Sequence, residues 1–199
     1  MKTGRLEAFS DGVLAIVITI MVLEMKAPED TTFKGLLAVA PVFVSYVLSF
    51  IYLGVYWNNH HHLMQVTQKV NGKILWANLH LLFWLSLIPF TTTWMGEHDH
   101  YYEALPVATY GFVLLMSALA YFILEYLLVK HHDDNFALTR LCKSNIKDYI
   151  SLGVYIIAIL LAFVNTWLAL ACYVIVALIW LMPEKKLEEF MEDIEGKNN

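Results

Sequence analysis

Six separate apolar runs constrain this chain more than any other feature of its sequence. The chain is 59% hydrophobic and 16% charged, which is too apolar for a soluble domain. Helices of about 20 residues cross the hydrocarbon core of a bilayer and satisfy their own backbone polar groups. We therefore predict an all-α, polytopic membrane protein with six transmembrane helices. The predicted spans cover residues 5–25, 33–57, 74–95, 105–129, 149–164 and 167–182.

The first run is short, because only Gly12–Met25 is continuously apolar, and a run of that length also fits a signal peptide. A helix that begins at Arg5 is about 31 Å long at 1.5 Å per residue, which is enough to span. The segment after the run offers no small-residue cleavage site, and Pro28 predicts the end of the helix. We therefore interpret residues 5–25 as a retained span.

Lys and Arg are distributed unevenly between the two sides of the predicted spans. Eleven of the 13 lie at the two termini and in the second and fourth loops, and the other two, Lys26 and Lys34, lie in the first loop. Cytoplasmic loops carry the excess of Lys and Arg. We therefore predict that both termini are cytoplasmic, with residues 1–183 as one transmembrane domain and residues 184–199 as a charged cytoplasmic tail.

One face of the first span is a stripe of aliphatic side chains with a single hydroxyl. At 100° per residue, Ile16, Thr19, Ile20 and Leu23 share one sector of the helix. Copies of this face around a symmetry axis would enclose a narrow hydrophobic pore that excludes water when closed. Periodicity alone favours the simpler alternative, in which the stripe contacts lipid or neighbouring helices.

The segment Phe9-Ser10-Asp11 carries polar groups into this span. Asp11 lies on a face turned away from the stripe, and a carboxylate at the membrane edge is costly unless donors or a cation meet it. We therefore predict that the segment fastens the cytoplasmic end of the helix to its neighbours. The available partners are Arg5, Trp57, His60, His61, Asn78 and His80.

The histidine and cysteine patterns do not favour a metal site, a cofactor or an enzyme. Adjacent helical residues point about 100° apart, so His60, His61 and His62 cannot all converge on one ion. Cys142 and Cys172 have neither CxxC spacing nor a secreted disulfide framework around them. We predict no cofactor and no catalytic residues.

Two blocks of sequence resemble a known family. Arg5-x-x-x-Phe9-Ser10-Asp11 followed by GVLAIVITIMVLEMKAP resembles the opening of the transmembrane protein 175 family, which comprises lysosomal-type potassium channels and their prokaryotic relatives. The segment Tyr56 to Thr92 resembles the second-to-third-helix part of that family. Six spans in a single copy is the prokaryotic arrangement, which implies a location in a prokaryotic plasma membrane.

The resemblance implies a homotetramer in which the first helix of each subunit lines a central potassium-permeable pore. On the family pattern, Ile16, Ile20 and Leu23 match the apolar pore rings, and Thr19 matches a hydroxyl position implicated in cation selectivity. The implied partners are other copies of the chain, membrane lipids and potassium ions, and not nucleic acid.

The resemblance also implies a structural signature that joins the first helix to the second. Its positions here are Arg5, Phe9, Ser10 and Asp11 with Trp57 and His60 or His61. The triple histidine leaves open which imidazole takes part. The chain also departs from the family at Asn71, where members often carry an acid.

Two functions follow from the sequence. The first is a potassium-selective, leak-type channel with a hydrophobic constriction, because no span carries the repeated Arg of a voltage sensor. The alternative is a proton-coupled transporter that would use His80, Glu125 and Asp11 as a relay.

Overall fold

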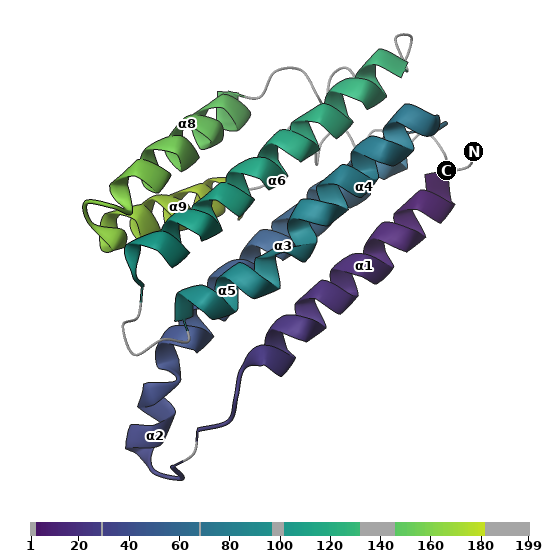
Figure 1. The fold of residues 1–199 in the computed structure, drawn as a ribbon. Helices are drawn as coiled ribbons and strands as arrows, with labels where there is room; N and C mark the ends of the chain where they lie inside the picture. Colours follow the sequence, from purple (N-terminus) through teal and green to yellow (C-terminus); the bar gives the residue numbers. More distant parts are fainter. Residues whose placement is uncertain (1–2, 29, 68, 97–101, 132–145, 182–199) are drawn as a thin grey trace.

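The computed structural model describes residues 3–28, 30–67, 69–96, 102–131 and 146–181. Within these ranges all regular secondary structure is helical, and the long helices pack side by side (Figure 1). The all-α prediction is therefore confirmed for the described residues. The predicted tail, residues 184–199, and Cys142 lie outside them. The helices are α1 (Thr3–Glu24), α2 (Phe33–Ala38), α3 (Ala40–Val66), α4 (Gly72–Ser86), α5 (Ile88–Gly96), α6 (Ala104–His131), α8 (Ile146–Leu161) and α9 (Thr166–Leu181).

The second predicted span, residues 33–57, differs from the structure at both ends. A separate short helix, α2, is capped by Thr32, whose hydroxyl accepts from the backbone N–H of Gly35. The helix is interrupted at Val39. α3 then begins with Pro41 in its first turn, where the missing N–H of proline leaves no helical hydrogen bond unmade. α2 leaves the bundle at an angle (Figure 1), whereas α3 continues beyond residue 57 to Val66.

The third predicted span, residues 74–95, is also interrupted. Asn71 caps α4 by accepting a hydrogen bond from the backbone N–H of Ile74 at 3.0 Å. The helix ends at Ser86, and α5 resumes at Ile88 with Pro89 as its second residue. Proline lacks the N–H that would bond to the preceding turn, which explains the break at Leu87.

α8 and α9 form a tight hairpin, in keeping with the gap of only two residues between the predicted spans 149–164 and 167–182. The side chain of Asn165 accepts from the backbone N–H of Trp167 at 3.0 Å and caps α9. Each helix has 16 residues, or about 24 Å of length at 1.5 Å per residue. By length and composition, four helical stretches of the described part could cross a membrane, namely 3–24, 40–66, 72–96 and 104–131, and α9 is a shorter apolar helix.

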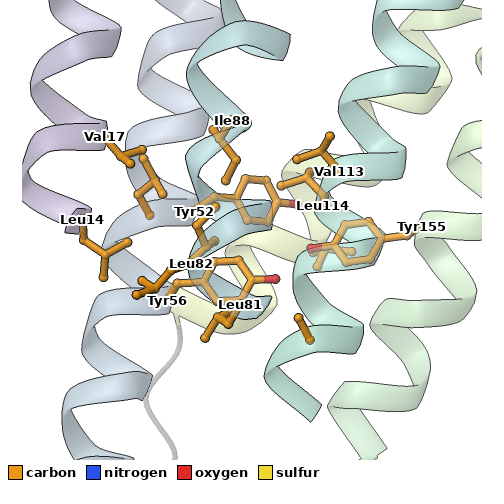
Figure 2. Packing of buried hydrophobic residues seen from close by; sticks show 14 of the residues in the cluster. Leu14, Val17, Tyr52, Tyr56, Leu81, Leu82, Ile88, Val113, Leu114 and Tyr155 are labelled. Atoms are coloured by element: carbon orange, nitrogen blue, oxygen red, sulfur yellow. The ribbon is translucent and has the colours of Figure 1, made fainter. Parts of the chain in front are cut away.

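The interior between α3, α5, α6 and α9 combines aromatic rings with hydroxyl groups. Ser49 Oγ lies 2.7 Å from Thr92 Oγ1 and 3.1 Å from the hydroxyl of Tyr110. The ring of Tyr110 contacts Tyr173 edge-on, with centroids 5.7 Å apart, and the Tyr173 ring packs directly over Gly111. Such polar contacts and close approaches hold helices together in lipid, where apolar burial contributes little. Figure 2 shows the surrounding apolar side chains, including Leu114 and Ile88.

The arrangement leaves α1 at one edge of the subunit. α1 packs against α3, α4 and α5, while the α8–α9 hairpin lies on the opposite side of the bundle (Figure 1). One side of α1 is therefore covered by its own chain, and the other is left exposed by the residues that the structure describes.

Candidate pore face and its anchors

The covered side of α1 is a narrow stripe of buried residues that recur every three or four positions. This spacing follows from the 3.6-residue turn of the helix, since it keeps each side chain on the side that faces α3, α4 and α5. The stripe fixes the rotation of α1 about its own axis. Its members are Leu6, Ser10, Leu14, Val17 and Met21.

The uncovered side of α1 carries the predicted pore residues. Ile16, Ile20 and Leu23 are 59%, 40% and 80% exposed, and Phe9 lies exposed on the same side nearer the N-terminus. No other part of the chain that the structure describes covers these aliphatic side chains. In a membrane they face either lipid or further copies of the chain. The structure of one subunit does not test their role, which stays a prediction.

Thr19 is also exposed on this side, and its hydroxyl has a defined orientation. Thr19 Oγ1 donates to the backbone carbonyl of Ile16 at 2.9 Å. Because the proton is directed into the helix, the oxygen lone pairs are directed outward. Thr19 can therefore offer an oxygen ligand to a cation while its own donor remains satisfied.

A groove runs alongside this face, between α1 and α5. It has a volume of about 670 Å³ and mostly apolar walls. Ile16 and Ile20 form part of the α1 wall, and Phe90 and Trp94 form part of the α5 wall. Glu24, at the end of α1, is the one charged residue in its described lining. α5 therefore lies beside the candidate pore residues, across the groove from them.

The first anchor at the other end of α1 joins Asp11 to α3. Trp57 Nε1 donates to Asp11 Oδ1 at 3.0 Å, and the indole ring stacks on the ring of His61, with centroids 5.9 Å apart. The carboxylate thus meets a donor at the membrane edge, as the cost of burying it requires. The structure brings together two of the predicted signature residues here.

The second anchor joins Ser10 to His60 through an asparagine of α4. Asn78 Nδ2 donates to Ser10 Oγ at 3.0 Å, and Ser10 Oγ donates to the carbonyl of Leu6 at 2.9 Å. Asn78 Oδ1 lies 2.8 Å from His60 Nε2, so this ring nitrogen carries the proton and donates. The other ring nitrogen, His60 Nδ1, is buried without a partner among the described residues.

The third anchor uses a residue that the sequence reasoning missed. His61 Nδ1 lies 2.8 Å from Oε1 of Glu7, and Gln65 Nε2 lies 2.9 Å from His61 Nε2. A carboxylate only accepts hydrogen bonds, so His61 donates from Nδ1 to Glu7. Glu7 lies one helical turn before Asp11, and this i, i+4 spacing was the signal that could have found it.

The remaining predicted residues lie apart from these anchors. Arg5 and Phe9 are exposed on α1, and no hydrogen bond or ion pair of Arg5 occurs among the described residues. His60 and His61 reach α4 and α1 respectively, in different directions, and the described residues include no group of side chains suited to a metal ion.

The residues of the proposed proton relay have other partners. His80 Nε2 accepts from Trp84 Nε1 of the same helix at 2.9 Å, and Asp11 accepts from Trp57. Neither hydrogen bond links His80 to Asp11. Glu125, the third residue of that relay, has a partner of its own in the structure.

Comparison with known proteins identifies the family to which this arrangement belongs. The family described as "Endosomal/lysosomal potassium channel TMEM175" matches residues 5–89, which contain all but the first two residues of α1 and all three anchors. A protein named potassium channel HX13_20290, from Chryseobacterium sp. (strain P1-3), is 52% identical over 193 residues, which cover 97% of this chain and 100% of the relative. The chain belongs to the TMEM175 family.

A solved member of the TMEM175 family has the same fold. The crystal structure of a lysosomal potassium-selective channel TMEM175 homolog from Chamaesiphon minutus superposes with a TM-score of 0.78 at 27% identity. The match covers 90% of this chain and 96% of that one. The predicted family resemblance is therefore confirmed, and the chain is an integral membrane protein with apolar helices.

Animal members of the TMEM175 family are much longer. The mouse protein, named endosomal/lysosomal proton channel TMEM175, is 31% identical over 101 residues, which cover 47% of this chain and 20% of the mouse chain.

Proposed function

We propose that this protein is a potassium-selective, leak-type channel whose pore is lined by α1. The observation that carries the proposal is the uncovered aliphatic face of α1 within the segment that matches the family. Bacterial relatives named as potassium channels support the choice of ion, and the same names make an enzyme a poor explanation. Apart from the permeant potassium ions, the channel needs no cofactor.

The proposed assembly is a homotetramer in lipid with α1 nearest the axis. Four copies of a face close into a ring by rotation, and each copy contributes the same side chains to each level of the pore. The turn between α8 and α9 is too short for one of these helices to cross the bilayer without the other. The hairpin therefore adds two crossings, and the total number of crossings is even. Six crossings then place both termini on one side, and the excess of Lys and Arg makes that side the cytoplasm of a prokaryotic plasma membrane.

The proposed conduction path alternates apolar rings with one ring of hydroxyls. Rings of Ile16, Ile20 and Leu23 would exclude water when the four helices are close, because a narrow aliphatic constriction dewets. Opening requires the rings to widen, and no charged voltage sensor is involved. Thr19 would supply oxygens between the rings, where an ion has lost part of its water.

A single-channel experiment tests this proposal. Purified protein in planar bilayers with asymmetric KCl and NaCl should give unitary currents that reverse toward the potassium equilibrium potential. Ile16→Asn, Ile20→Asn and Leu23→Asn should each change conductance or leak, because a polar side chain wets the constriction. Ile157→Asn is the matched control, since Ile157 is 55% exposed on α8, which does not contact α1.

The outcomes separate the channel from its alternative. Unchanged currents in all three α1 variants would reject the pore assignment. Silent bilayers together with proton-coupled uptake in vesicles would favour the proton-coupled transporter.

A further inference from the structure

A second polar feature lies inside the subunit, on the far side of the bundle from the exposed face of α1. It is a small pocket between α3, α6, α8 and α9, which we call the tyrosine pocket. Its volume is about 40 Å³, whereas a cavity needs roughly 10 to 15 Å³ to hold one buried water. The pocket therefore has room for a few waters or one small solute. Its polar and aromatic lining includes Tyr56, Asn59, Tyr121, Asp148, Tyr155 and Trp180.

The aromatic walls of the tyrosine pocket are held in fixed orientations. Tyr56 and Tyr121 meet edge-on, with centroids 6.1 Å apart and planes 62° apart. Trp180 Nε1 donates to Ser151 Oγ at 2.9 Å, which fixes the indole across the α8–α9 interface. Figure 2 shows Tyr155 reaching from α8 with its hydroxyl directed toward Tyr56 and α3. Rings fixed in this way offer preformed faces and hydroxyls to a ligand.

The charge in the described lining of the tyrosine pocket is negative only. Asp148 lies in the first turn of α8 and lines the pocket, whereas the described lining residues include no Lys, Arg or His. A carboxylate beside several aromatic rings is a combination that favours an organic cation, because the faces of the rings carry partial negative charge.

We propose that the tyrosine pocket binds a small ammonium cation, through the carboxylate of Asp148 and the faces of Tyr56 and Tyr121. The site is separate from the α1 face and does not depend on conduction. Asn59 and Tyr155 add polar contacts for the N–H groups. Asp148 also has another partner in the structure, and a carboxylate can accept several hydrogen bonds at once.

Thermal unfolding of the full-length protein in detergent, titrated with methylammonium chloride, tests the proposal. We expect a saturable rise in Tm, because a ligand that binds only the folded protein stabilises it. Potassium chloride at equal ionic strength and methanol, a neutral molecule of similar size, should give no such saturable rise. A rise that does not saturate, or an equal rise with potassium chloride or methanol, overturns the proposal and leaves a pocket that holds water only.

Two pairs of variants locate the site. Asp148→Asn should weaken methylammonium binding roughly tenfold or more, whereas Glu103→Gln, which removes an exposed acid at the start of α6, should not. Tyr121→Leu should weaken binding, whereas Tyr121→Phe, which keeps the ring, should retain it. Methylammonium binding that survives both Asp148→Asn and Tyr121→Leu would lie elsewhere and overturn the assignment.

The same preparation separates this proposal from the proposed function. Potassium currents that persist while methylammonium gives no saturable shift would refute the tyrosine pocket and leave the channel intact. A specific shift in a protein without currents would do the reverse. If Asp148→Asn fails to fold, the wild-type titration and the Tyr121 pair still decide the outcome.

Discussion

Ser10 and Ser117 form a matched pair that isolates one hydrogen bond between helices. Both side chains are fully buried, and each hydroxyl donates to the carbonyl four residues earlier, Leu6 at 2.9 Å and Val113 at 2.8 Å. Among the described contacts, only Ser10 also accepts a bond from another helix, from Asn78 Nδ2 at 3.0 Å. The difference between the two alanine variants therefore reports the link between α1 and α4.

Ser10→Ala removes the acceptor and leaves one N–H of Asn78 buried without a partner. A buried polar group without a partner costs about 1–3 kcal/mol in soluble proteins, whereas double-mutant cycles in a membrane protein average about 0.6 kcal/mol per interhelical bond. The low end of the first range applies, since Asn78 keeps its bond to His60. We expect Ser10→Ala to lower the free energy of unfolding by about 1 to 2 kcal/mol more than Ser117→Ala does.

Unfolding in mixed micelles with increasing SDS, followed by circular dichroism, measures both free energies under the same conditions. A double-mutant cycle of Ser10→Ala with Asn78→Ala then gives the coupling energy between the two side chains. The double variant should lose less free energy of unfolding than the sum of the two single losses, because both single variants remove the same hydrogen bond. Equal losses in Ser10→Ala and Ser117→Ala, together with no coupling in the cycle, would refute the reasoning that this hydrogen bond anchors α1.

Two further predictions concern packing and the pore. Gly111→Ala should lower the free energy of unfolding by about 1–3 kcal/mol in the same SDS titration, because a Cβ there would overlap the ring of Tyr173 and overpack the interior. Gly54→Ala is its control, since nothing lies within 4 Å of a Cβ at that position, and an equal loss in both would contradict the packing argument. Thr19→Val keeps the shape of the side chain and removes its oxygen, so it should reduce the preference for potassium over sodium as measured by reversal potential. An unchanged reversal potential would exclude Thr19 from ion selection.

Local sequence was sufficient to predict the helical membrane architecture and the two sides of α1. Six apolar runs predicted the positions of the helices, because the bilayer requires every backbone polar group to be paired within its own segment. The 3.6-residue period placed Ile16 and Ile20 together and turned Asp11 away from them. Trp57 was among the partners proposed for Asp11, and the structure places the two in contact.

Sequence reasoning did not predict where the helices are interrupted. The break at Val39 divides the predicted span 33–57, and the break at Leu87 divides the span 74–95. Pro41 and Pro89 stand near these breaks, but a proline is compatible with a kinked helix as well as with a first turn. The choice depends on how the flanking helices pack.

The pattern of the chain by itself determined that α1 has an aliphatic face and polar residues near its N-terminal end, and it was enough to indicate the family. Only the tertiary structure decided that His60 reaches Ser10 through Asn78 and that His61 reaches Glu7. It also decided that the aliphatic face is left exposed by the part of the subunit that the structure describes. The physical reason is the range of the forces. Backbone hydrogen bonding and helical period act within a few residues, whereas the partner of a side chain depends on the rotation and spacing of helices that are distant in sequence.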